Sequence, residues 1–234
     1  MKISIQILII LVLISCSKRN KNQTEIKQER TIAKSEFSQI VFLDKFSNEL
    51  ILDTLKLETD ITYSPIYIGK KSDTLNLTYQ PSKMKFRTME WFKYKKPNSN
   101  RIKIFIDTSR IIGSSMGIWE YYKASEYRLN KKAYPVFIEN IGKDTLSIGF
   151  GDILPIVTEA KDSIGNWKPL HRQFIYSCGT GLSEFYLPPK HLSLTTMKLY
   201  YGDYKTKLRI AFRLGDKKIV SNEINGFVDY EFLK

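Results

Sequence analysis

The sequence predicts an all-β fold of short antiparallel strands packed as a sandwich. Apolar and polar residues alternate along Leu208–Leu214, along Ile102–Ile106, and at Val228, Tyr230 and Phe232. This period of two is typical of strands with one buried face and one wet face. Turn signals such as Ile164-Gly165-Asn166 separate the strands, and no long stretch has a convincing helical period. Aromatic residues make up 13% of the chain, which is typical of a folded protein with a substantial core.

Residues 1–15 have the composition of an export signal. Lys2 precedes a run from Ile3 to Ile14 that is apolar apart from Ser4 and Gln6. The run is shorter than the roughly 20 apolar residues that a permanent membrane helix needs. We therefore expect the leader to be removed, although a buried N-terminal strand or an uncleaved anchor remains an alternative.

The leader ends in Leu13-Ile14-Ser15-Cys16, which resembles the lipobox of bacterial lipoproteins. The resemblance implies cleavage before Cys16 and lipid attachment to that cysteine, with a diacylglyceryl thioether and an amide-linked acyl chain. Several acyl chains together give stable anchoring. The expected partner of the N-terminus is therefore a membrane.

Residues 16–35 are polar and lack aromatic side chains, so we expect a flexible basic tether. In some Gram-negative groups, lipoproteins bound for the cell surface carry acidic residues after the cysteine. Here the cysteine is followed by Ser17-Lys18-Arg19. The expected location is the outer membrane, facing the periplasm.

Two β units are expected after the tether, at residues 36–120 and 121–234. A faint internal repeat suggests this division: Pro65–Ile68 and Asp73–Leu77 parallel Pro135–Ile138 and Asp144–Ile148. In each copy a strand is followed by a polar turn and a second strand. The repeat predicts either a hairpin of the same kind in both halves or a duplicated domain.

The second unit carries a family resemblance. Val136–Asn140 followed by Gly142–Leu146 resembles the opening of bacterial Ig-like domains. The later segments Trp167–Leu170, Cys178–Gly181 and Gly202–Arg209 are similar to uncharacterised envelope lipoproteins. The resemblance covers about half of the chain. It implies an Ig-like β-sandwich for residues 121–234 and a location in the cell envelope, but it implies no particular chemical activity.

The formal charge of +13 would indicate nucleic acid as a partner of a cytoplasmic protein. Export excludes nucleic acid as the default partner and leaves anionic lipid or acidic glycan. One possible ligand surface combines cations with aromatic residues; the alternative is a solvated hairpin with its aromatic residues in the core. Its members are Lys83, Lys85, Arg87, Trp91, Lys93, Tyr94, Lys95 and Lys96. A second row, Lys205, Lys207, Arg209 and Arg213, is expected to be the solvent face of a strand.

The sequence predicts neither a catalytic residue, a metal site nor a cofactor. Cys178 lies between His171 and His191 in the sequence, so a Cys–His pair is conceivable, yet no surrounding motif resembles a protease or transpeptidase. We expect loop or edge positions for the two histidines and a small buried role for Cys178. Asp162–Asn166 lacks the dense carboxylates of a calcium loop, so we expect a β-turn.

Four Asp-Ser/Thr-aliphatic triplets resemble the signal for general O-glycosylation of exported proteins in one group of Gram-negative bacteria. The possible acceptors are Thr54, Thr74, Thr145 and Ser163. The alternative is local structure, in which Asp ends a turn and the next two residues begin a strand.

These patterns together predict a membrane-anchored envelope lipoprotein that acts as a non-enzymatic binding or interaction module. The expected ligand is an envelope protein or an acidic glycan. Two alternatives remain open. One is an envelope hydrolase acting on glycan or cell-wall substrates, and the other is a structural subunit of an envelope complex.

Overall fold

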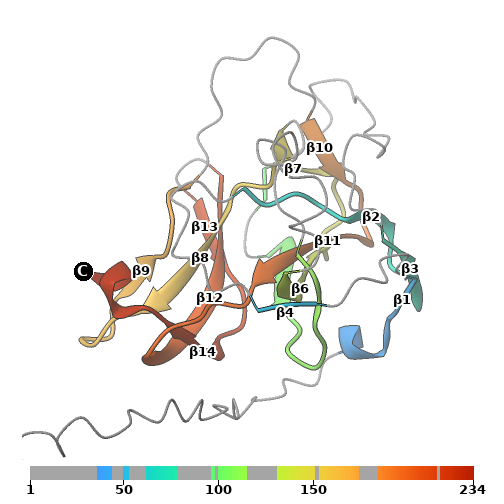
Figure 1. The fold of residues 1–234 in the computed structure, drawn as a ribbon. Coiled ribbons are helices and arrows are strands. Elements are labelled where there is room, and N and C mark those ends of the chain that lie inside the picture. The colour runs from blue at the N-terminus through green and yellow to red at the C-terminus, as the bar shows by residue number, and fades with distance from the viewer. Residues whose placement is uncertain are drawn as a thin grey trace, which may run out of the picture.

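The computed structural model describes residues 36–43, 50–52, 62–77, 96–97, 100–114, 131–150, 153–173, 184–214 and 217–234. These residues form β-strands and two short 3₁₀ helices, η1 (Glu36–Gln39) and η3 (Tyr230–Leu233), arranged as in Figure 1. The predicted all-β fold is therefore confirmed. None of the helices in the described ranges is long and apolar enough to cross a membrane.

The first large sheet, called the β6 sheet, is antiparallel throughout and contains five strands. Their bounds, in spatial order, are β2 (Tyr67–Lys70), β11 (His191–Lys198), β6 (Lys132–Asn140) and β4 (Ile102–Ile106), with β5 (Ile112–Gly113) also paired to β6. Three of these strands, β2, β4 and β5, precede residue 120, whereas β6 and β11 follow it. The expected boundary near residue 120 therefore separates strands that share one sheet.

The second large sheet, called the β12 sheet, is also antiparallel with five strands. Their bounds are β13 (Lys217–Val220), β12 (Tyr204–Leu214), β8 (Ile156–Lys161) and β9 (Trp167–Pro169), with β14 (Ile224–Val228) also paired to β12. The alternating patterns at Ile102–Ile106 and Leu208–Leu214 thus correspond to real strands.

The third alternating pattern was only partly right, because β14 ends at Val228. Tyr230 and Phe232 belong to η3 instead. Asp229 caps this helix, and its carboxylate accepts a hydrogen bond from the Glu231 amide at 3.0 Å. A capped turn leaves the extended conformation, so three alternating residues were too few to predict a strand here.

Two small sheets complete the described structure. Strands β7 (Leu146–Phe150) and β10 (Glu184–Leu187) are antiparallel. Strands β1 (Val41–Leu43) and β3 (Thr74–Asn76) are parallel, which differs from the predicted uniformly antiparallel arrangement.

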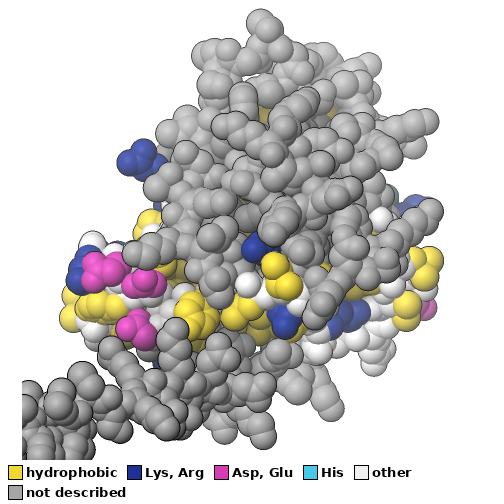
Figure 2. Space-filling model, in the orientation of Figure 1, with side chains coloured by type: hydrophobic (Ala, Val, Ile, Leu, Met, Phe, Trp, Pro, Cys, Tyr) yellow, Lys and Arg dark blue, Asp and Glu magenta, His cyan; other side chains and the backbone are white. Residues whose placement is uncertain are grey.

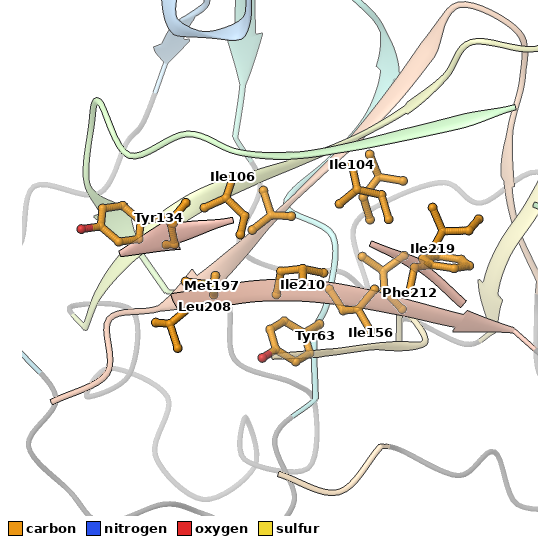
Figure 3. Close-up of a cluster of buried hydrophobic side chains, with 14 of the residues drawn as sticks. Tyr63, Ile104, Ile106, Tyr134, Ile156, Met197, Leu208, Ile210, Phe212 and Ile219 are labelled. Carbon is orange, nitrogen blue, oxygen red and sulfur yellow. The ribbon is translucent and has the colours of Figure 1, made fainter. Parts of the chain in front are cut away.

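Two hydrophobic clusters lie on opposite faces of the β6 sheet. The larger fills the space between the β6 and β12 sheets, and Figure 3 shows Ile104 and Ile106 of β4 facing Ile210 and Phe212 of β12. The smaller lies under η1, β1 and β3 and is centred on Phe137 of β6, which is fully buried. The β6 sheet is consequently the middle layer of three (Figure 1).

The internal repeat has a structural counterpart that is not a hairpin. Tyr67 of β2 and Phe137 of β6 both pair with Leu194 of β11, so the two repeat strands flank β11 at the same level. The strand that follows each of them leaves the sheet: β3 pairs with β1, and β7 pairs with β10. The hairpin prediction was therefore wrong in both halves, because a short turn does not determine which distant strand the chain joins next.

Asn222 joins the two large sheets. Its side-chain amide accepts a hydrogen bond from the Ile106 amide at 2.7 Å and donates one to the Ile106 carbonyl at 3.1 Å. Both backbone groups of the last residue of β4 are thereby satisfied by the connection between β13 and β14. Because buried backbone groups need such partners, this side chain takes the place of a further strand.

Candidate functional site

A face of charged and aromatic side chains covers the outside of the β12 sheet. Alternation directs Leu208, Ile210 and Phe212 into the core, as predicted, and their neighbours outward. We call the outward set the β12 cationic face. Its members are Lys205, Lys207, Arg209 and Arg213 of β12, Lys161 and Glu159 of β8, Trp167 of β9 and Lys218 of β13.

Glu159 is the anchor of this face. Its side chain is 0% exposed and lies directly opposite Arg209 across the β8–β12 pairing. The carboxylate contacts Arg209 at 2.9 Å, Arg213 at 2.5 Å and Lys218 at 2.6 Å. Burial pushes the pKa of Glu159 up, but hydrogen bonds from the three cations outweigh this effect, and the net pKa is lowered. The carboxylate therefore stays ionised and holds the cations in place.

Trp167 adds an aromatic surface beside these charges. The guanidinium of Arg209 lies 3.9 Å from the ring centroid, and the Lys161 ammonium lies 5.1 Å from it. Farther along the same strand face, Lys205 and Lys207 are exposed. The predicted solvent face is therefore wet at Lys205 and Lys207, while Arg209 and Arg213 are half-buried around Glu159.

His171 has a structural role at the end of β9. Its side chain is buried, and its Nδ1 donates to the Arg172 carbonyl at 2.9 Å. This leaves Nε2 as an acceptor, 3.1 Å from the Thr158 amide and 2.9 Å from the Tyr63 hydroxyl. Burial lowers the pKa of His171 to about 4, although the Arg172 carbonyl opposes the shift. Both ring nitrogens are thus occupied at neutral pH, in a residue predicted to lie in a loop or at an edge.

Two tyrosines and a threonine complete this buried cluster. The Tyr63 hydroxyl lies 2.6 Å from Thr158 Oγ1. Burial raises the pKa of Tyr63 well above its usual value and also raises the pKa of Tyr200. Both phenols therefore remain protonated, and the cluster joins Tyr63 to β8 and β9 through neutral hydrogen bonds.

The structure gives no support for the hypothetical pair of Cys178 with His171 or His191. His191 begins β11 in the other large sheet, and its Nδ1 lies 3.0 Å from the Pro189 carbonyl. Cys178 lies outside the described residues. Within the described ranges, no group of His, Cys, Asp and Glu side chains is arranged to hold a metal ion.

Most of the first predicted ligand surface lies outside the described residues, as does Cys16. Of the set between Lys83 and Lys96, the structure describes Lys96, which is exposed. That surface therefore stays a prediction.

The possible glycosylation acceptors differ in exposure. Thr74 and Ser163 are exposed and Thr145 is half-buried, while Thr54 lies outside the described residues. Around Ser163 the Asp162 carboxylate accepts hydrogen bonds from the amides of Ile164 at 3.1 Å and Asn166 at 2.8 Å. The Gly165 amide also donates to the Asp162 carbonyl at 3.1 Å, and this backbone hydrogen bond confirms the β-turn predicted for Asp162–Asn166. Glycosylation itself stays a prediction.

Sequence reasoning missed Glu159 because no local motif marks it. Its three cationic partners are separated from it by roughly fifty residues or more along the chain, and only the register of β8 against β12 and β13 brings them together. An alternation pattern predicts which residues share a face but not which strand lies beside them.

Comparison with known proteins gives no family to which the site can be referred. No family model, curated protein or solved structure matches this chain.

Proposed function

We propose that this protein is a lipid-anchored, non-enzymatic module of the bacterial cell envelope, and that its Ig-like β-sandwich binds acidic glycan through the β12 cationic face. The proposed anchor is lipid on Cys16, followed by the basic tether of residues 16–35. The proposed location is the outer membrane, facing the periplasm.

The observation that carries the binding proposal is the excess of cations around Glu159. In the described part of the face, six Lys and Arg side chains surround this one carboxylate, so most of their charge remains for a ligand. Because Glu159 and Trp167 hold Arg209, its guanidinium loses little freedom when it binds an anion.

The spacing of the exposed lysines favours a polymer over a small ion. Alternate residues of an antiparallel strand lie about 7 Å apart, so Lys205, Lys207 and Arg209 form a line of charges along β12. An extended acidic polysaccharide presents carboxylates at intervals of several ångström and can contact more than one of them. Trp167, which lies beside this line with its ring against Arg209, offers the apolar surface on which sugar rings stack.

Removal of the exposed lysines is expected to weaken polymer binding. In the variant Lys205→Gln/Lys207→Gln, the affinity of the full-length protein for polygalacturonate at low salt should fall about tenfold, because two exposed cations are lost without a change in the core. Affinity electrophoresis with polygalacturonate, and with neutral dextran as the reference polymer, measures this change.

Lys70→Gln/Lys143→Gln is the matched control, because both lysines are exposed and belong to the β6 sheet or its connections. The proposal requires that this control binds nearly as well as the native protein. An equal loss in both double variants would show that the total charge, and not the β12 cationic face, determines binding. Retention on an acidic protein but not on the polymer would replace glycan by protein as the ligand.

The anchor has its own test. We expect Cys16→Ser to release nearly all of the protein from the membrane fraction, because the only proposed attachment is lipid on that thiol. Cys178→Ser should leave the protein in the membrane fraction. Mass spectrometry of the N-terminal fragment checks the modification directly, and an intact Met1 terminus with an unmodified Cys16 would disprove the anchor.

A further inference from the structure

A cavity of about 390 Å³ lies where β9 ends, beside η3. Part of its lining is apolar: Val157 of β8 and Leu170 are buried, and Phe232 of η3 is half-buried. Figure 1 shows η3 beside β9 at this end of the β12 sheet. The volume is within the range of about 300–1,000 Å³ that is typical of small-molecule sites.

The polar lining of this cavity is cationic. Arg172 and Arg213 both line it, together with Gln173, and its described lining contains no carboxylate. Arg172 is exposed, so its side chain is free to turn toward a ligand. In Figure 2 the acidic side chains of the visible face gather mainly at the end of the molecule where Figure 1 places η3. The described cavity lining itself nevertheless carries positive charge only.

Arg213 has hydrogen-bonding capacity that the protein does not use. One terminal nitrogen of its guanidinium donates to Glu159 at 2.5 Å, but Nε is buried and has no hydrogen-bond partner among the residues that the structure describes. A buried donor without a partner destabilises the protein, and a ligand that accepts from it removes this cost. Because Glu159 is already shared with Arg209 and Lys218, the charge of Arg213 is not cancelled by that carboxylate.

His171 fixes the shape of the cavity without supplying a charge. Its ring is held by the Thr158 amide and the Arg172 carbonyl. Gln173 donates to the Arg213 carbonyl at 3.1 Å, which ties the chain after β9 to β12. The backbone that carries the two arginines is thus fixed by these hydrogen bonds before a ligand binds.

We infer that this cavity binds a small organic carboxylate, with the carboxylate between Arg172 and Arg213 and the apolar part against Leu170, Val157 and Phe232. This site goes beyond the proposed glycan binding, since it takes a small amphipathic acid and does not involve Lys205 or Lys207. An arginine fork suits a carboxylate because two parallel N–H groups match its two oxygens.

Phenylacetate and its neutral analogue phenylacetamide are the probes for this site. Isothermal titration calorimetry of the full-length protein in detergent should show that phenylacetate binds and that phenylacetamide binds at least about tenfold more weakly. Arg172→Gln should weaken phenylacetate binding about tenfold. Arg213→Lys, which keeps a positive charge beside Glu159, should weaken it by a similar factor because lysine lacks the fork.

Lys217→Gln is the matched control, because it removes one exposed cation of β13 that lies outside both the β12 cationic face and the described lining of the cavity. Unchanged phenylacetate affinity in this variant, combined with the loss in Arg172→Gln, supports the assignment. Equal binding of acid and amide, no measurable binding of phenylacetate, or no effect of Arg172→Gln in a protein with the native unfolding midpoint would overturn it. Failure of polygalacturonate binding leaves this result unaffected, so the two proposals are tested separately.

Discussion

Between pH 6.5 and pH 4 the protein is expected to lose about 3 kcal/mol of its free energy of unfolding through His171 alone. Burial lowers the pKa of this imidazole from 6.5 to about 4 in the folded protein. The unfolded chain therefore takes up the proton first as the pH falls. The contribution is fully present above the unfolded pKa, declines through this window, and has gone once the pH is below the folded pKa.

The hydrogen bond that the His171 ring accepts from the Thr158 amide also favours the neutral form of the ring. In the neutral ring, Nε2 accepts from the Thr158 amide, whereas a protonated ring would place a second N–H group against that donor. With Nδ1 already donating to the Arg172 carbonyl, a protonated ring could donate from Nε2 to the Tyr63 hydroxyl at 2.9 Å, but it would lose the hydrogen bond from the Thr158 amide. Protonation is thus opposed both by desolvation and by geometry.

Urea unfolding across this pH range, compared between the native protein and His171→Gln, measures the effect. Carboxylates contribute almost equally to both proteins, so the difference between the two pH profiles isolates the histidine. His191→Gln, at the start of β11, should reproduce the native profile. If His171→Gln loses stability with falling pH as steeply as the native protein does, the buried neutral role of His171 is wrong.

The sequence was a good guide to the strands that have one wet face. At Ile102–Ile106 and Leu208–Leu214 the alternation predicted both the strand and its buried side, because half-exposed strands impose that period on the sequence. The segment Pro135–Ile138 could also be recognised as a strand. The sequence did not show that both faces of this strand are buried. Phe137 packs on the opposite side of the sheet from Val136 and Ile138.

The elements that were missed depend on partners distant in sequence. The parallel pairing of β1 with β3 and the meeting of β2 and β6 on either side of β11 join segments that no local pattern connects. The candidate sites are also formed by residues that are distant in sequence. Glu159 acquires its cations from β12 and β13, and the cavity combines the end of β9 with Phe232. Local sequence determines extended structure, but register and layer order determine which side chains meet.

Arg110→Ala is expected to lower the free energy of unfolding by about 3 kcal/mol, because it removes one partner of a buried ion pair. The Asp107 side chain is 0% exposed and lies 3.0 Å from Arg110 Nε. The same guanidinium donates to the Phe37 carbonyl at 2.7 Å and to the Ile40 carbonyl. It therefore fixes η1 and the start of β1 to the β6 sheet.

The aromatic contacts of this segment depend on the same arginine. Phe37 stacks on Phe137 with ring centroids 4.5 Å apart, and the Arg110 guanidinium lies 4.5 Å from the centroid of Phe42. In the proposed lipoprotein, the tether joins the sandwich at η1, so any force on the anchor reaches the fold through these contacts. Loss of Arg110 should therefore open residues 36–43 before the β12 sheet opens.

Urea unfolding and amide hydrogen exchange together check this prediction. Exchange at Val41, whose amide donates to the Asp73 carbonyl, should accelerate strongly in Arg110→Ala, while exchange in β12 should change little. Arg110→Lys should restore only part of the stability, because an ammonium lacks the planar fork that reaches a carboxylate and two carbonyls. Lys103→Ala is the control, since its ion pair with Glu36 is exposed on both sides and is worth less than about 1 kcal/mol. Equal losses in Arg110→Ala and Lys103→Ala, or uniformly faster exchange in both large sheets, would mean that the segment is held by burial of Phe37 and not by the arginine.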